Sequence, residues 1–286
     1  MQITPATLLC GVLLHPSGHT RSPAMHNAAY RALSIDAVYL AFDVAPERLA
    51  DAVTGLRALC AAQISVSLPH KRAVMAHLDR IDETARRIGA VNTVVRDADA
   101  LVGSNTDWSG AVRALERETS LRGARAVVLG AGGTARALVH GLIERGARVR
   151  VLNRTPARAR ALCDELGADS AGSLASLVDV PYDVLVNTTR VGMNEDVSPV
   201  EASALGADAV VMDAVYEPER TRLLREAEAR GARTIAGKWM LVYQAALQLE
   251  AWTGRPAPIE VMAEAFDRAG KRPKAARSEP KANEAQ

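Results

Sequence analysis

Residues 126–135 read Ala-Val-Val-Leu-Gly-Ala-Gly-Gly-Thr-Ala. Ala126–Leu129 is short and apolar, which is typical of a buried strand, and a helical pattern follows from Thr134 to Arg145. A strand, a glycine turn and a helix in this order match the dinucleotide fingerprint G-x-G-x-x-A. Such a turn lets a pyrophosphate approach the N–H groups at the start of the helix. The segment therefore predicts a nucleotide-binding α/β fold.

The residues of this turn are the first candidates for binding a cofactor. Gly130 permits the tight turn, Gly132 permits close approach of the backbone, and Ala135 permits close helix–strand packing. The full set of candidates in the turn is Gly130, Ala131, Gly132, Gly133, Thr134 and Ala135.

The next predicted strand, Arg148–Leu152, indicates which dinucleotide is bound. It is followed by Asn153-Arg154-Thr155 and then Arg158, and the first acid is Asp164. An acid after this strand would bind the ribose 2′-hydroxyl of NAD, whereas a guanidinium binds a phosphate through two donors. We therefore expect NADP, with Asn153, Arg154, Thr155 and Arg158 near its 2′-phosphate. For Arg158 and Arg160, a solvated helix face is an equally good interpretation.

Short apolar runs alternate with helical patterns on both sides of the glycine turn. The predicted strands are Leu8–Leu14, Ala37–Phe42, Ile64–Leu68, Val91–Val95, Leu101–Gly103, Ala126–Leu129, Arg148–Leu152, Asp183–Val186, Ala209–Met212 and Thr234–Ile235. The predicted helices are Pro23–Leu33, Pro46–Cys60, Asp82–Ile88, Trp108–Arg117, Thr134–Arg145, Arg220–Arg230, Trp239–Trp252 and Ile259–Ala269. This alternation predicts largely parallel sheets in an α/β protein, with domain junctions near Asp107 and Gly237.

Composition excludes several other classes of protein. A length of 286 residues favours two domains, and a net charge of +2 is too small to indicate nucleic acid or a membrane as partner. Cys10, Cys60 and Cys163 form no disulfide framework or metal pattern. We expect no transmembrane segment and no signal peptide, and therefore a cytoplasmic protein. The polar residues 271–286 predict a disordered tail.

Polar residues concentrate in four clusters outside the nucleotide-binding segment. The clusters are His19–Asn27, Ser65–Lys71, Gly89–Thr93 and Gly103–Asp107. Polar residues beside glycine and proline at strand ends are typical of ligand sites in α/β proteins. Their hydroxyl, amide, ammonium and carboxylate groups fit a polyhydroxylated acid. The spacings of His15, His19, His26 and His70 match no zinc signature, so no metal site is expected and these histidines are interpreted as structural.

These clusters resemble the motifs of the shikimate dehydrogenase family. Gly11–Pro23 resembles G-x-x-x-x-P-x-x-H-S-x-S-P, and Ser65–Lys71 resembles N-V-T-x-P-[HYF]-K. Further matching segments are Gly89–Thr93, Asn105–Asp107, Asn187–Met193, Asp213–Pro218, Gly237–Gln244 and Trp252–Gly254. The resemblance thus runs in order from residue 11 to residue 254.

The resemblance implies a fold and a reaction. The fold is two α/β domains around a cleft: a substrate domain of residues 1–107 and 238–270, and a Rossmann-type NADP-binding domain of residues 108–237. The C-terminal helices return to the first domain. The reaction is the reversible reduction of 3-dehydroshikimate to shikimate with NADPH, in aromatic amino acid and chorismate biosynthesis. A small molecule is the expected partner, bound by a monomer or a homodimer.

The resemblance also implies roles for individual residues. Lys71 and Asp107 match the catalytic pair. The implied substrate-binding residues are Thr20, Ser22, Ser67, Asn92, Gln244 and Tyr216, and the further cofactor-binding candidates are Thr188, Gly237 and Met240. Elementary chemistry agrees, because hydride addition to a ketone builds negative charge on oxygen, which a nearby cation stabilises. Lys71 fits this requirement either as proton donor or as an electrostatic group.

Three residues depart from the family motifs at positions expected to face the substrate. Thr20 stands where the family usually has serine, and Ser65 and Ser67 stand for asparagine and threonine. Thr20 adds a methyl group, and the shorter Ser65 is expected to open space near the substrate. Quinate and aminoshikimate therefore stay as alternative substrates.

Two other functions fit the fold less well. A non-catalytic, NADP-sensing regulator would keep the glycine turn and Arg154 but would not need Lys71, Asp107 and Gln244 together. A folate-type dehydrogenase of related architecture is disfavoured by the hydroxyl-rich segment Thr20–Ser22.

Overall fold

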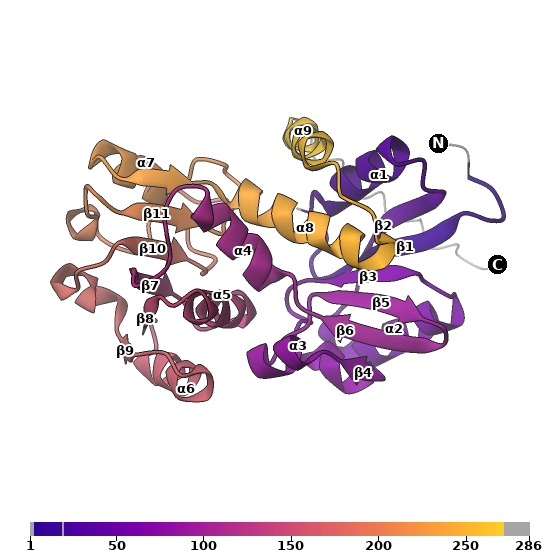
Figure 1. Ribbon diagram of the computed structural model, residues 1–286, viewed down its shortest axis with the longest axis horizontal. Helices are drawn as coiled ribbons and strands as arrows, with labels where there is room; N and C mark the ends of the chain where they lie inside the picture. The colour runs from indigo at the N-terminus through magenta and orange to yellow at the C-terminus, as the bar shows by residue number, and fades with distance from the viewer. Residues whose placement is uncertain (1–2, 19, 272–286) are drawn as a thin grey trace, which may run out of the picture.

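The computed structural model describes residues 3–18 and 20–271, which form two six-stranded sheets flanked by helices (Figure 1). His19 and the predicted tail from residue 272 onward lie outside the described residues. Strands pair in parallel except at the two contacts of β5 (Thr93–Asp97) with its neighbours. The prediction of an α/β protein with largely parallel sheets is confirmed.

The first sheet has the strand order β2-β1-β3-β5-β6-β4. Its other strands are β1 (Leu8–Leu14), β2 (Ala37–Asp43), β3 (Gln63–Val66), β4 (Arg80–Ile81) and β6 (Ala100–Ser104). β1 is parallel to both β2 and β3. β6 folds back along β5 because only Ala98 and Asp99 connect them, and so short a connection joins antiparallel strands.

The second sheet has the order β12-β11-β10-β7-β8-β9, and all its pairings are parallel. Its strands are β7 (Arg125–Leu129), β8 (Arg148–Leu152), β9 (Ser170–Gly172), β10 (Val184–Asn187), β11 (Val210–Asp213) and β12 (Arg233–Ile235). β7 lies between β8 and β10, so the strand order reverses there. Such a switch point leaves a crevice at the carboxyl ends of the strands, where ligands bind.

Nine helices belong to the described part of the chain. They are α1 (Ser22–Ala32), α2 (Leu49–Ala58), α3 (Glu83–Ile88), α4 (Asp107–Glu116), α5 (Gly133–Glu144), α6 (Pro156–Leu166), α7 (Arg222–Ala229), α8 (Gly237–Thr253) and α9 (Ile259–Gly270). Short 3-10 helices occupy Pro46–Arg48, Ala73–His77, Leu174–Asp179 and Ala202–Ala204. The sequence patterns do not predict α6, β4 and β9. The buried side of α6 includes only Ala159, Leu162 and Cys163, so its apolar periodicity is weak.

Helix α8 joins the two halves of the molecule. Its Met240 and Tyr243 pack in the core of the second sheet, whereas Val242, Ala246 and Leu249 pack in the core of the first. Figure 1 shows α8 crossing between the halves, with α9 returning beside α1. The expected return of the C-terminal helices to the first half is confirmed.

The helices at the junction pack closely. A Cβ atom on Gly110 of α4 would lie 2.7 Å from the backbone nitrogen of Gln244 in α8, so only glycine permits this approach. The predicted junction residues Asp107 and Gly237 are the first residues of α4 and α8. The domain boundaries themselves stay a prediction.

Within the described ranges, no helix has both the length and the apolar character needed to span a membrane.

Candidate active site

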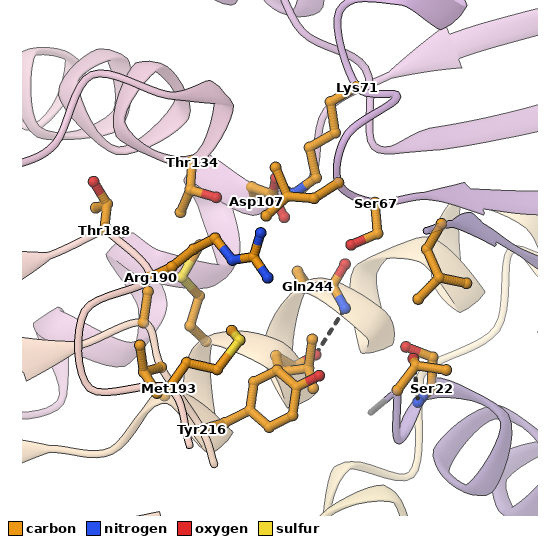
Figure 2. Close-up of a pocket in the computed structure, with 18 of the residues that line it drawn as sticks. Ser22, Ser67, Lys71, Asp107, Thr134, Thr188, Arg190, Met193, Tyr216 and Gln244 are labelled. Atoms are coloured by element: carbon orange, nitrogen blue, oxygen red, sulfur yellow. Dashed lines mark hydrogen bonds and ion pairs between the residues drawn. The ribbon is translucent and has the colours of Figure 1, made fainter. Parts of the chain in front are cut away.

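A cleft lies between the two halves, where several strands of both sheets end (Figure 2). In its lining, Ser67 follows β3, Thr188 follows β10 and Ala214 follows β11. Loops at the ends of parallel strands share one edge of a sheet, so the polar residues of both sheets meet in this cleft.

The cleft brings together most residues predicted to bind substrate or to catalyse. Of the predicted site residues, Thr20, Ser22, Ser67, Lys71, Asp107, Thr134, Thr188, Tyr216, Gly237, Met240 and Gln244 line it. Those outside its lining are Asn92, Gly130, Ala131, Gly132, Gly133, Ala135, Asn153, Arg154, Thr155 and Arg158. Thr189 and Arg190 also line it; both belong to the matching segment Asn187–Met193, but neither was a predicted site residue. A basic residue just beyond a strand end is the signal that could have identified Arg190.

Lys71 and Asp107 form an ion pair inside the cleft. The distance from Nζ of Lys71 to Oδ2 of Asp107 is 2.5 Å, and the two side chains are 11% and 6% exposed. Lys71 lies in the loop after β3, and Asp107 is held at the start of α4 by its backbone N–H, which donates to Oδ1 of Asn105 at 3.0 Å. The site therefore presents an ammonium group whose direction is set by a buried carboxylate.

Asn92 lies behind this pair and orients it. Its Nδ2 group donates to Oδ1 of Asp107 at 2.8 Å and to Oε1 of Gln244 at 3.2 Å. Its Oδ1 accepts a hydrogen bond from the backbone of Thr106 at 2.7 Å. Asn92 thus connects the catalytic candidates to Gln244, although it is not part of the cleft lining.

Ser65 lies away from the cleft, so the expectation that it opens space beside the substrate is wrong. Its hydroxyl accepts from the hydroxyl of Tyr39 at 2.6 Å and donates to Oε1 of Gln248 at 2.8 Å. Nε2 of Gln248 in turn donates to the backbone carbonyl of Asn92 at 3.0 Å. Gln248 was not predicted from the sequence, although a polar side chain one turn beyond Gln244 in an apolar helix is a signal for it.

The opposite side of the cleft is a tight turn after β10. Oδ1 of Asn187 accepts from both the backbone N–H and the hydroxyl of Thr189, at 3.0 and 2.8 Å. These bonds fix residues 187–191 in one conformation. As a result, the side chain of Arg190 is directed into the cleft, as Figure 2 shows.

A buried carboxyl group, Asp213, supports this turn and the loop that carries Tyr216. It accepts hydrogen bonds from Nδ2 of Asn187 at 2.9 Å, from the backbone of Val215 at 2.9 Å and from the hydroxyl of Thr221 at 2.7 Å. Burial raises the pKa of Asp213 to about 6, because the charged form loses its hydration.

The glycine turn after β7 has the geometry that a dinucleotide requires. Gly130 has φ of 113°, which favours glycine, and a Cβ atom there would lie 2.7 Å from the hydroxyl oxygen of Thr188. A Cβ atom on Gly132 would meet nothing within 4 Å, so the backbone faces open space before α5 begins at Gly133. Open space at a helix start suits a phosphate group.

The residues predicted to select the dinucleotide lie at the end of β8, beside β7. Arg154 and Arg158 are exposed, and neither side chain makes a hydrogen bond or ion pair with residues 3–18 or 20–271. Nδ2 of Asn153 donates to the backbone carbonyl of Thr155 at 3.0 Å. These guanidinium groups are therefore accessible to a phosphate, and the fit of the site to NADP is good.

The histidines have structural surroundings. Nδ1 of His15 lies 2.8 Å from Oδ1 of Asp43, and Nε2 of His70 lies 2.8 Å from the backbone carbonyl of Val44. His26 is stacked on Tyr39, and burial lowers its pKa to about 3. Among the described residues, no group of histidine, cysteine and acidic side chains is arranged to hold a metal ion.

These features define a class of protein: two α/β halves, a nucleotide-type glycine turn, and a cleft with an ion pair facing that turn. Comparison with family models shows which family within this class the chain belongs to. The model described as shikimate dehydrogenase substrate binding domain matches residues 12–94. The models described as shikimate/quinate 5-dehydrogenase and shikimate 5′-dehydrogenase C-terminal domain match residues 112–191 and 237–265. The chain belongs to the shikimate dehydrogenase family.

Individual relatives agree over almost the whole chain. Shikimate dehydrogenase (NADP(+)) of Thermococcus kodakarensis is 48% identical over 87% of this chain and 92% of its own length. The protein of the same name from Methanothermobacter thermautotrophicus is 45% identical over 93% of this chain and 98% of its own. The crystal structure of shikimate 5-dehydrogenase from Thermus thermophilus, in complex with NADP(H) and shikimate, is 40% identical, with a TM-score of 0.87 and coverage of 92% and 100%.

The buried Asp213 predicts how stability depends on pH. Because the folded-state pKa is raised from 3.8 to about 6, the folded protein binds the proton more tightly than the unfolded chain. The free energy of unfolding should therefore fall as pH rises from about 4 to about 6. Asp213→Asn removes the charged form. The decrease in the free energy of unfolding over this pH range should therefore be smaller by about 3 kcal/mol, because one pKa unit corresponds to about 1.4 kcal/mol. Urea denaturation of both proteins across this pH range measures it. Identical pH profiles would contradict the assignment.

Proposed function

We propose that this protein is an NADP-dependent shikimate dehydrogenase, which catalyses the reversible reduction of 3-dehydroshikimate to shikimate. The observation that carries the proposal is the ion pair of Lys71 and Asp107, held inside a cleft that also adjoins the glycine turn. Relatives named shikimate dehydrogenase (NADP(+)), 48% and 45% identical, support it. So does the Thermus thermophilus complex with NADP(H) and shikimate.

The substrate is proposed to bind along the side of the cleft formed by the first half. The hydroxyl groups of Thr20 and Ser22 receive the carboxylate, and both residues line the cleft at the start of α1. Ser67 and Gln244 interact with the ring hydroxyls, and Asn92, which was predicted to do the same, holds Gln244 and Asp107 in place. Tyr216 closes the cleft from the second half. Burial raises its pKa to about 12, so it stays protonated at neutral pH.

Chemistry at the ketone is assigned to Lys71 and Asp107. Bound NADPH supplies the hydride that the carbonyl carbon receives. The ammonium of Lys71 donates a hydrogen bond to the carbonyl oxygen and stabilises the negative charge that develops there. The alkoxide oxygen then takes up a proton, either directly from solvent or from the ammonium of Lys71, which solvent reprotonates, and the products are the alcohol and NADP. Oδ2 of Asp107 lies 2.5 Å from Nζ of Lys71 and fixes the direction of the ammonium. Little reorganisation is therefore needed when negative charge develops on the carbonyl oxygen.

The second half of the chain is proposed to bind NADP. Gly130–Ala135 receives the pyrophosphate at the start of α5, and Thr188, Gly237 and Met240 line the cleft next to it. Arg154 binds the 2′-phosphate at the end of β8, with Asn153, Thr155 and Arg158 around it. We also propose a cytoplasmic, biosynthetic enzyme.

A substrate panel tests this function. Shikimate, quinate and aminoshikimate are offered with NADP and with NAD, and kcat/KM is measured for each pair. The highest value is expected for shikimate with NADP, because Thr20 and Ser22 retain both hydroxyls for a carboxylate. A higher value for quinate would assign the protein to that alternative. NADP binding without turnover of any substrate would favour a regulator.

Cofactor selection is tested with Arg154→Ala. Loss of one charge-assisted phosphate contact is expected to lower kcat/KM for NADP by about 10- to 100-fold and to leave kcat/KM for NAD nearly unchanged. Arg160→Ala is the matched control, since it removes an exposed arginine of α6 that is not assigned to the cofactor. Equal use of both cofactors by the unmodified protein would show that Arg154 does not select NADP.

A further inference from the structure

We propose that Arg190 recognises the carboxylate of the substrate by charge and makes the enzyme selective for anionic substrates. This inference rests on the proposed function, because it concerns the ligand of the same cleft. Arg190 lines the cleft, and within the matching segment Asn187–Met193 it occupies a position where the family motif specifies no residue.

The charges of the cleft single out Arg190. Among the described residues that line it, the charged side chains are Lys71, Asp107 and Arg190. Lys71 and Asp107 neutralise each other at 2.5 Å. The guanidinium of Arg190 makes no hydrogen bond or ion pair with the described part of the chain. The cleft therefore carries one uncompensated positive charge, and it belongs to Arg190.

The structure holds this charge at a defined place. The turn fixed by Asn187 directs the side chain away from β10, and Figure 2 shows the guanidinium within the cleft rather than turned outward. The lining also includes Met193, Tyr216 and Gln244, which carry no charge. In a cleft partly removed from water, a guanidinium attracts an anion more strongly than in bulk solvent.

The carboxylate is the anion that needs this charge. The hydroxyl groups proposed to receive it, on Thr20 and Ser22, are neutral donors. The arginine between them is already engaged: Nη2 of Arg21 lies 3.7 Å from Oε2 of Glu217, and its guanidinium carbon lies 4.3 Å from the ring centre of Phe266. A carboxylate that leaves water without a counter-charge loses much of its hydration energy. Arg190 supplies that counter-charge.

The phosphates of the cofactor have other partners. The glycine turn faces open space at the start of α5, and Arg154 lies at the end of β8, outside the cleft lining. Arg190 follows β10 and points into the cleft. The turn that carries it also adjoins Gly130, where a Cβ atom would lie 3.2 Å from Cγ2 of Thr189, so a cofactor phosphate is the competing ligand that the KM for NADP must distinguish.

The test compares the acid with its neutral ester. For the unmodified protein, Arg190→Met and Arg190→Lys, kcat/KM is measured with shikimate and with methyl shikimate, and KM is measured for NADP. In Arg190→Met the ratio of kcat/KM for acid over ester should fall by about 10- to 100-fold, through KM for the acid. Arg190→Lys should retain part of the ratio, and KM for NADP should not change. Arg122→Met, an exposed arginine outside the cleft, is the control for net charge.

Two results would overturn the proposal. A raised KM for NADP with an unchanged acid-to-ester ratio would assign Arg190 to a cofactor phosphate. Unchanged values of kcat/KM for both acid and ester, together with an unchanged KM for NADP, would show that Arg190 binds neither ligand. If the unmodified protein does not turn over shikimate, the proposed function fails. In that case calorimetry measures the dissociation constants of shikimate and methyl shikimate for the unmodified protein and for Arg190→Met. An equal acid-to-ester ratio of dissociation constants in the two proteins would refute the role of Arg190.

Discussion

The ion pair of Lys71 and Asp107 is the interaction on which the rest of the site depends. A largely buried ion pair needs close geometry and further hydrogen bonds to offset its lost hydration. Asn92 supplies one of those bonds, and Gln248 fixes the backbone of Asn92 in turn. The position of the Lys71 ammonium is therefore determined by a continuous set of contacts, from the loop after β3 through the start of α4 to the interior of α8.

The same lysine also contacts the second half of the molecule. A Cβ atom on Gly133, the first residue of α5, would lie 3.7 Å from Cδ of Lys71, so the stem of the lysine adjoins the helix start that is proposed to bind phosphate. On the other side, α8 packs against Gly110 of α4 and presents Gln244 to Asn92. Close packing at these points places the helix start proposed for the cofactor beside the lysine proposed for the substrate.

Local sequence patterns were sufficient for the glycine turn and the class of fold, and the family resemblance supplied the predicted residues that line the cleft. The turn at Gly130 depends on chemistry within ten residues, and such patterns can be read directly from the chain. Contacts between distant segments could not be predicted in this way. Ser65 bonds to Gln248, 183 residues away, so its distance from the substrate follows from packing alone. The sequence places Arg190 just beyond a strand end, but the entry of its side chain into the cleft depends on the folded turn. Helix α6 was not predicted because small residues weaken its periodicity.

The most direct test of the central claim is the turnover of Lys71→Ala, measured together with its affinity for NADP. If the ammonium stabilises charge on the reacting oxygen, kcat should fall by orders of magnitude while the dissociation constant for NADP stays the same. Lys238→Ala is the matched control, because Lys238 is equally buried and paired with Asp267 at 2.8 Å but lies outside the cleft lining. A Lys71→Ala variant with a turnover near that of the unmodified protein would remove the ion pair from the mechanism.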